Sequence, residues 1–268
     1  MEKIYLWEND VPAFDNEIEQ DKPNIRLFLK EGAKSLVIIC PGGAYIVKVD
    51  QHEGIDIAEY LNSINVSAMV LDYRVKPYKY PIPQYDAKRA IRYARYYAEK
   101  LGYDKDKIGI MGFSAGGHLA ASMGTIWDDL EYETQDEIDK ESGRADFMIL
   151  CYPVISLDAH THIGTRMAHL GDVLSREAEK LSLASRVTKD SSPAFVWHTL
   201  NDEVVPVENS LEFAAAMARN SVSCELHVYK NGVHGTGLGN GNNCQLNEDV
   251  ARWAKELEIW MKDMGYIY

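Results

Sequence analysis

Short apolar runs that alternate with helical patterns constrain the fold of this chain more than any other feature of its sequence. Seven such runs are rich in β-branched residues, and the middle ones are almost continuously apolar. They lie at residues 24–30, 34–40, 66–73, 107–112, 146–152, 193–199 and 224–229. Strands have this composition when helices cover both faces of a sheet. We therefore expect an α/β fold with a doubly wound, mostly parallel sheet flanked by helices.

Amphipathic helical patterns fill the gaps between these runs. They begin after His52, at Gln84, at Ser114, near Val207 and near Leu246. The second pattern forms one stripe as far as Leu101, and Gly102 supplies a C-terminal stop. The runs at 24–30 and 34–40 are too close together for a crossover helix, so we expect them to pair antiparallel at one edge.

Two stretches depart from this alternation. Residues 126–146 are dense in acidic side chains and are typical of a solvated surface excursion. Residues 154–190 carry short helical pieces between two core strands, so we expect a small helical insertion there, long enough to cover a site. The chain shows no internal repeat, low-complexity tract or linker, and residues 1–268 are therefore expected to form a single domain.

Charge and cysteine content narrow the classes of partner. The chain has 41 acidic and 28 basic residues, a net charge of −13 that repels the phosphate backbone of nucleic acids. Its four cysteines include no Cys-x-x-Cys pair, which favours buried free thiols in a reducing compartment. The first residues lack a signal-peptide pattern, and no segment is long enough to span a membrane, so we expect a cytoplasmic protein without a membrane partner. A homo-oligomer remains possible.

The segment Gly-Phe-Ser-Ala-Gly joins the apolar run at 107–112 to a helix of small residues. It places Ser114 between Gly112 and Gly116. A serine hydroxyl needs a base to become a nucleophile, and a sharp strand-to-helix turn of this spacing points its oxygen outward. An ordinary serine at a tight junction is the alternative, but the strand–turn–helix context favours the nucleophile. We expect His118, one helical turn later, to pack beneath this turn.

An acid and a base should follow the nucleophile in the chain order Ser, Asp or Glu, His. Asp202 comes just after the run at 193–199, at the end of a strand where ligands bind in such sheets, and its neighbour Glu203 is the main rival. His234 lies in a glycine-bordered loop after the last run, where the base is expected.

The tetrahedral intermediate of acyl transfer also needs N–H donors for its oxyanion. We expect one from Ala115, directly after the nucleophile, and another from the glycine-containing loop Pro41–Tyr45. A phosphate-binding role for this loop is disfavoured, because no Gly-Lys-Ser/Thr follows it. His160 and His162, with Asp158 nearby, have no matching ligand cluster, so we expect no metal site.

Together these residues resemble the α/β-hydrolase superfamily, and more narrowly its acetyl-esterase branch, which includes acetylxylan esterases and related lipase/esterase proteins. The resemblance rests on the following segments: PGGAY, HEGIDIAEYLN, VLDYRV, DAKRAIRYAR, GFSAGGHLA, HTLNDEVVPVENS and NGVHG. It covers nearly the whole chain. It implies Ser114 as nucleophile, Asp202 as acid and His234 as base.

The resemblance also implies an oxyanion hole formed by the N–H groups of Gly43, Ala44 and Ala115, with Gly42 shaping the turn. Many esterases of the superfamily carry His-Gly-Gly-Gly at this loop, whereas this chain has Pro41 and Ala44 at the ends of the motif. Backbone donors survive this change, because neither Gly43 nor Ala44 is proline.

Other side chains are given structural roles. Asp72 and Arg74 are expected to fix loops through ion pairs, and Arg89 and Arg92 to lie on a solvated helix face. We suggest four residues as candidates for the border of the acyl pocket: Tyr45, Trp127, Met167 and Trp197. Each of these residue types more often belongs to the core.

The hypothesis is a serine carboxylesterase for short acyl groups, most plausibly acetyl groups on xylan-derived or other sugars, working without a cofactor on a small-molecule or oligosaccharide ester. A serine peptidase or amidase of the same fold is one alternative. The other is a non-catalytic binding protein that retains the fold.

Overall fold

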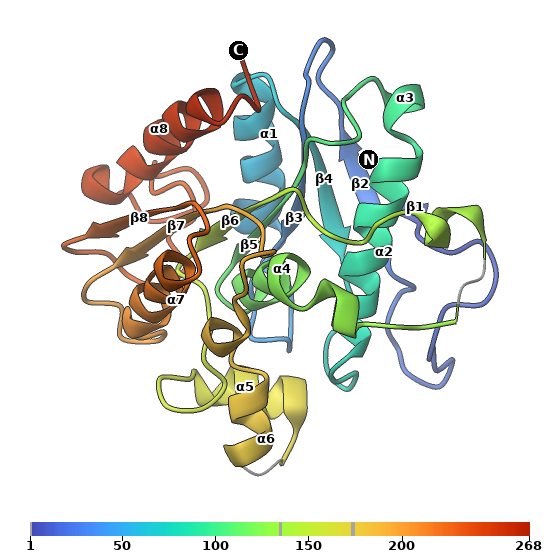
Figure 1. The fold of residues 1–268 in the computed structure, drawn as a ribbon, viewed down its shortest axis with the longest axis horizontal. Helices are drawn as coiled ribbons and strands as arrows, with labels where there is room; N and C mark the ends of the chain where they lie inside the picture. The colour runs from blue at the N-terminus through green and yellow to red at the C-terminus, as the bar shows by residue number, and fades with distance from the viewer. Residues whose placement is uncertain (1, 134–135, 173–174) are drawn as a thin grey trace.

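A computed structural model describes residues 2–133, 136–172 and 175–268. Their centre is an eight-stranded sheet with the order β1-β2-β4-β3-β5-β6-β7-β8 (Figure 1). The strands are β1 (Ile4–Tyr5), β2 (Asn24–Phe28), β3 (Leu36–Cys40), β4 (Ser67–Asp72), β5 (Ile108–Phe113), β6 (Phe147–Cys151), β7 (Ala194–Thr199) and β8 (Cys224–Tyr229). All seven predicted runs form strands, and β1 is an addition. The strands from β4 to β8 run parallel, which confirms the predicted doubly wound α/β fold.

Helices cover both faces of the sheet. They are α1 (Asp56–Ser63), α2 (Ile82–Tyr96), α3 (Ala98–Leu101), α4 (Ala115–Thr125), α5 (Ile163–Leu170), α6 (Ser175–Lys180), α7 (Glu208–Arg219) and α8 (Glu248–Asp263). Shorter turns are the π-helical η1 (Gln51–Ile55) and the 3₁₀ turns η2 (Trp127–Asp129), η3 (Glu137–Lys140) and η4 (Leu183–Arg186). None of the helices in the described parts of the chain is long and apolar enough to cross a membrane.

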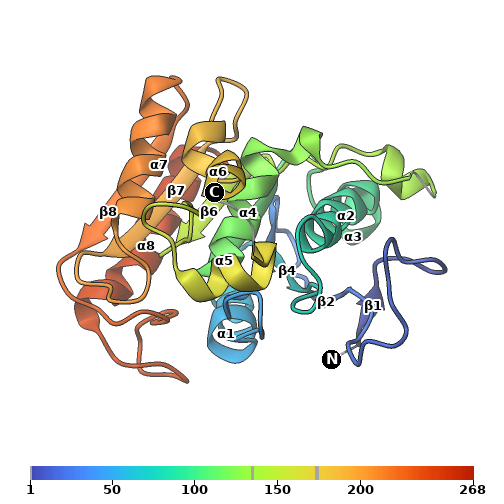
Figure 2. The ribbon, with the colours of Figure 1, turned by 90° about the horizontal axis from the view of Figure 1, so that it is seen from below.

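Alternate residues of each strand feed two separate cores. Leu36 and Ile38 of β3 pack with α2, α4 and α7, whereas Val37 and Ile39 pack with α1 and α8. Figure 2 shows α2, α4 and α7 on one side of the sheet and α1 and α8 on the other. Burial on both faces explains why the middle strands are apolar at nearly every position.

The prediction that the first two runs pair with one another is wrong. β2 is antiparallel, but its partner is β4, which lies between β2 and β3. β4 is buried along almost its whole length and therefore takes an interior position, whereas three of the five residues of β2 are only partly buried. The residues between β2 and β3 reach across one strand, because adjacent strands lie only about 4.8 Å apart.

The helix boundaries differ from the predicted stripes in one place. The stripe that begins near Gln84 is interrupted at Tyr97, so that α2 ends there and α3 forms a separate short helix. Gly102 ends α3 with a φ of 87°, as predicted for a C-terminal stop. The residues between β6 and β7 form the predicted small helical insertion, with α5, α6 and η4.

The predicted ion pairs of Asp72 and Arg74 are present, whereas the prediction of a solvated helix face for Arg89 is wrong. Arg74 and Asp86 form a fully buried pair with N–O distances down to 2.6 Å, and Asp72 pairs with Lys48. Arg89, however, does not lie on a solvated face. It is buried at 1% exposure and pairs with Asp136 and Asp139 from the acidic stretch.

This pairing also corrects the interpretation of residues 126–146. Asp139 is buried, and Arg92, with a side chain 15% exposed, also contacts it. The acidic stretch therefore docks on α2 through paired charges, rather than being solvated throughout. The four cysteines are free, but only Cys40 and Cys151 are buried, while Cys224 and Cys244 are partly exposed.

Candidate active site

Ser114 occupies a strained turn between β5 and α4. Its φ is 53° and its ψ is −119°, a combination that residues with a side chain rarely adopt. The residue donates its backbone N–H to the carbonyl of Cys151, and its own carbonyl accepts from Val154, each at 3.0 Å. Backbone contacts to the neighbouring strand therefore hold the turn, and the serine is 8% exposed.

The flanking glycines are required by close backbone contacts. A Cβ atom on Gly112 would lie 2.0 Å from the carbonyl oxygen of Gly116. A Cβ atom on Gly116 would lie 2.1 Å from the carbonyl oxygen of Cys40, at the end of β3. The Gly-x-Ser-x-Gly spacing thus has a steric cause, because only glycine lets α4 begin this close to β3 and β5.

His234 links Ser114 to Asp202. Its Nε2 lies 2.8 Å from the Ser114 Oγ, and its Nδ1 lies 2.7 Å from Asp202 Oδ2. An ionised carboxylate only accepts hydrogen bonds, so Nδ1 carries the proton and Nε2 is free to accept one from the serine. The loops after β5, β7 and β8 therefore bring the three sequence-predicted residues into one hydrogen-bonded chain.

Asp202 is held in place on both carboxylate oxygens. Oδ1 accepts from the backbone N–H groups of Val204 and Val205, each at 2.9 Å. Burial raises the pKa of Asp202, but hydrogen bonds from His198, His234 and Val205 outweigh burial and hold the pKa well below its usual value. The rival carboxylate, Glu203, is exposed. Geometry therefore favours Asp202 over Glu203 as the partner of His234.

The loop after β3 presents backbone donors beside Ser114. Positive φ values at Gly43, Ala44 and Tyr45, of 127°, 59° and 57°, turn this loop sharply. Gly42 donates its N–H to Glu53 Oε2 at 2.9 Å and is therefore committed. Within the described residues, the N–H groups of Gly43 and Ala44 donate to no protein atom. Ala115, as the first residue of α4, also has an N–H without a partner inside the helix.

A cavity of about 580 Å³ opens over these groups. Its lining combines Ser114 and His234 with apolar side chains of the loop after β3 and with residues of η1 and the insertion. It is formed by Gly43, Ala44, Ile46, Val47, Val49, His52, Glu53, Ser114, His162, Val204, His234 and Gly235. The four residues suggested for the pocket border, three aromatics and one methionine, do not line it. Tyr45 and Trp197 are instead fully buried, one in each core, which agrees with the observation that these residue types more often belong to the core.

His162 is the contribution of the insertion to this cavity. It precedes α5, and its Nδ1 accepts from the backbone N–H of Thr165 at 3.3 Å. A neutral imidazole that accepts at Nδ1 carries its proton at Nε2. Burial lowers the pKa of His162, which favours this neutral form. Sequence reasoning considered His162 only as a metal ligand, and the described residues contain no cluster of three or more ligands for a metal ion.

Glu53 and Tyr152 are site residues that sequence reasoning missed. Glu53 accepts from the hydroxyl of Tyr152 at 2.7 Å, and both side chains are buried. The Tyr152 ring lies edge-on to His234, with centroids 5.0 Å apart. The only sequence signal was the place of Glu53 in the segment HEGIDIAEYLN.

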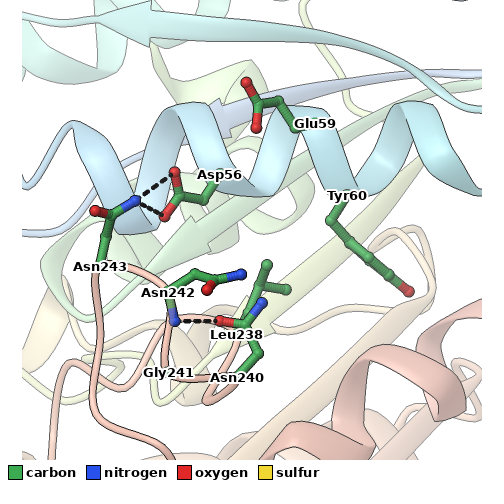
Figure 3. A pocket seen from close by; sticks show the side chains of 8 residues that line it. All are labelled: Asp56, Glu59, Tyr60, Leu238, Asn240, Gly241, Asn242 and Asn243. Carbon is green, nitrogen blue, oxygen red and sulfur yellow. Dashed lines mark hydrogen bonds between the residues drawn. The ribbon is translucent and has the colours of Figure 1, made fainter.

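A larger polar hollow of about 660 Å³ lies between α1 and the loop 238–243 (Figure 3). Its lining includes Asp56, which accepts both hydrogen bonds from the Asn243 amide, together with Glu59 and Tyr60. This hollow has no serine or histidine in its lining, whereas Ser114 and His234 line the smaller cavity.

Two buried histidines contact Tyr45, in the loop after β3. His118 accepts at Nδ1 from the hydroxyl of Tyr45 at 3.1 Å, and its Nε2 faces the carbonyl of Leu181. The ring of His169, from α5, stacks on Tyr45 with centroids 4.1 Å apart. The buried His118 thus lies one helical turn after Ser114 and links the loop after β3 to the insertion through Tyr45 and His169.

The chain is similar in sequence and in structure to known proteins. The model of the family described as BD-FAE matches residues 27–217. Among solved structures, an acetyl ester-xyloside bifunctional hydrolase from Caldicellulosiruptor lactoaceticus is 41% identical, with a TM-score of 0.93. That likeness covers 100% of this chain and 97% of the other.

Two curated relatives are larger proteins. An acetylxylan esterase of Xylanibacter ruminicola is 30% identical over 257 residues, which cover 91% of this chain and 50% of that protein. An endo-1,4-beta-xylanase B of Butyrivibrio fibrisolvens is 34% identical over 227 residues, covering 81% of this chain and 35% of that protein. The chain thus spans half or less of the length of these relatives.

The buried state of His118 predicts how stability depends on pH. Burial lowers the pKa of His118 to about 4, with the hydrogen bond to Leu181 opposing it. An unfolded histidine titrates near pH 6.5, so the stability that neutral His118 contributes is present above that pH and is lost between about pH 6.5 and 4. Each such buried histidine steepens the dependence of the free energy of unfolding on pH by up to about 1.4 kcal/mol per pH unit.

We expect His118→Gln to flatten this slope when the free energy of unfolding is measured in urea between pH 7 and 4. His160→Gln, which removes a histidine whose side chain is 39% exposed, serves as the matched control and should leave the slope nearly unchanged. An unaltered slope in His118→Gln would contradict the prediction, whatever the change in stability at pH 7.

Proposed function

This chain belongs to the BD-FAE family, within the acetyl-esterase branch of the α/β-hydrolase superfamily, and we propose that it is a serine carboxylesterase that removes acetyl and other short acyl groups from carbohydrate esters. The observation that carries the proposal is the hydrogen-bonded chain from Ser114 through His234 to Asp202. One continuous sheet supplies all three residues, which supports the further proposal that residues 1–268 act as one domain.

In the proposed mechanism, His234 Nε2 takes the proton of Ser114 as the serine oxygen attacks the ester carbonyl. Asp202 keeps the imidazole in the required tautomer and stabilises its charged form. The N–H groups of Gly43, Ala44 and Ala115 bind the oxyanion. The intermediate then expels the alcohol, which receives its proton from His234, and leaves an acyl group on Ser114.

Water completes the cycle. His234 removes a proton from the water molecule that attacks the acyl-enzyme, and the second tetrahedral intermediate releases the acid while Ser114 regains its proton. Every step uses protein groups and water.

Two observations support a carbohydrate ester as substrate. The relatives described above are named as acting on acetyl esters, xylosides or xylan. The cavity also offers the Nε2–H of His162, which donates to no acceptor among the described residues and fits a sugar hydroxyl. Its apolar walls at Ile46, Val47 and Val204 suit a short acyl chain.

The role of Asp202 is tested by a matched pair of neighbouring carboxylates. Asp202→Asn should lower kcat/KM for an aryl acetate by about 10⁴-fold, because the amide favours the wrong tautomer of His234. Glu203→Gln should stay close to the wild type, since that side chain is exposed. The reverse pattern, a loss with Glu203→Gln alone, would assign the acid to Glu203.

The substrate class is tested by a panel of esters. We expect acetate release from acetylated xylo-oligosaccharides, and a steep fall in kcat/KM as the acyl chain on one reporter alcohol is lengthened from acetyl to octanoyl. An aminoacyl amide substrate of similar size should be hydrolysed far more slowly than the acetyl ester. A preference for long acyl chains, or for the amide, would overturn the deacetylase proposal.

A further inference from the structure

Glu53 is a buried carboxylate that the proposed mechanism does not use. It lies in η1 at 2% exposure, and none of the ion pairs in the described residues gives it a lysine or arginine partner. An unpaired carboxylate is costly to bury unless hydrogen bonds satisfy it. Two donors meet this need, the backbone N–H of Gly42 at 2.9 Å and the hydroxyl of Tyr152 at 2.7 Å.

These two donors belong to different parts of the site. Gly42 precedes Gly43 and Ala44 in the loop after β3. Tyr152 follows β6, and its hydroxyl oxygen accepts the N–H of Gly237, from the loop that carries His234, at 3.1 Å. A Cβ atom on Gly42 would lie 2.6 Å from Glu53 Oε2, so the glycine at this position makes room for the carboxylate.

We propose that Glu53 is a positioning residue for the reaction, whose ionised carboxylate ties the oxyanion loop to the loop of His234 through Tyr152. This inference rests on the proposed function. It goes beyond the roles of Ser114, His234 and Asp202, because Glu53 acts through the groups that it orients.

The directions of the hydrogen bonds require an acceptor on both oxygens of Glu53. The N–H groups of Gly42 and Gly237 can only donate. Since Tyr152 accepts from Gly237, its own proton goes to Glu53. Burial and the neighbouring charge of Glu53 raise the pKa of Tyr152 well above its usual value, so the hydroxyl remains a donor. A glutamine at position 53 has an acceptor only on its carbonyl oxygen, because its NH2 group can only donate, and its nitrogen therefore cannot replace the second carboxylate oxygen.

The charge of Glu53 also acts on the base. Burial raises the pKa of Glu53, while its two hydrogen bonds and the charges of His52 and His234 lower it. The negative charge of Glu53 therefore attracts the imidazolium that forms on His234 during the reaction, and Glu53→Gln removes this attraction. The titratable groups around this pair are Asp202, Tyr152 and His162 next to His234, and His52, Tyr73, Cys151 and Tyr152 next to Glu53.

The test compares Glu53→Gln with Glu59→Gln. Glu59 is an exposed glutamate on α1, beside the larger hollow (Figure 3), and its replacement should change nothing. For Glu53→Gln we expect kcat for an aryl acetate to fall about 10- to 100-fold with little change in KM, because the donors and the base lose their alignment. We also expect the acidic limb of the pH profile of kcat/KM to move to lower pH.

A loss of kcat without a shift of the acid limb would overturn the proposal, since a purely structural role would leave the limb in place. Unchanged kcat would overturn it as well. If the wild type itself lacks esterase activity, the proposed function fails instead, so the two failures are distinct.

Tyr152→Phe supplies a second variant that keeps the carboxylate. It should lower kcat about tenfold, because Gly237 and Glu53 each lose a partner. The double variant with Glu53→Gln and Tyr152→Phe should have a kcat close to that of the less active single variant, since both substitutions break the same network. Losses that multiply would overturn the proposal. If Glu53→Gln does not fold, Tyr152→Phe carries the test alone, and wild-type kcat in that variant would contradict it.

Discussion

The close approach of the start of α4 to the ends of β3 and β5 is the constraint on which the rest of the site depends. Gly116 stands against the carbonyl of Cys40, and Gly112 stands against Gly116, with no space for a side chain at either position. This packing forces Ser114 into its strained conformation. The strain is maintained because both cores of the sheet, on opposite faces, hold the strands and the helix in place.

The parallel sheet turns this one strained residue into a site. The carboxyl ends of β3, β5, β7 and β8 lie at one edge, so the loops that follow them meet although they are far apart in the sequence. Asp202 and His234 reach Ser114 from two such loops, and Gly43 and Ala44 come from a third. The Glu53–Tyr152 network fastens these loops beneath the cavity, with no salt bridge to either side chain among the described residues.

The sequence predicts those features that have a local cause. The glycines around Ser114 are a local steric requirement, and the strand ends are marked by apolar runs, so the placement of Asp202 and His234 followed from them. The pairing of β2 was mispredicted because close spacing suggests a hairpin and says nothing about a later strand inserted between the two. The burial of Arg89 was missed because its partners, Asp136 and Asp139, are distant in the sequence, and Asp136 lies 47 residues after Arg89. Both belong to a stretch whose acidic composition is typical of a solvated surface. Glu53 was missed for the same reason, since its partner Tyr152 lies 99 residues away.

The central claim is that Ser114 is the residue that becomes acylated. The most direct measurement is to treat the folded protein with an aryl fluorophosphonate, determine its intact mass, and map the modified peptide. We expect one adduct per chain, on Ser114, with loss of esterase activity in proportion to labelling. Esterase activity that persists in protein without an adduct at Ser114 when the reagent is in excess, or an adduct on another residue that accompanies inactivation, would contradict it.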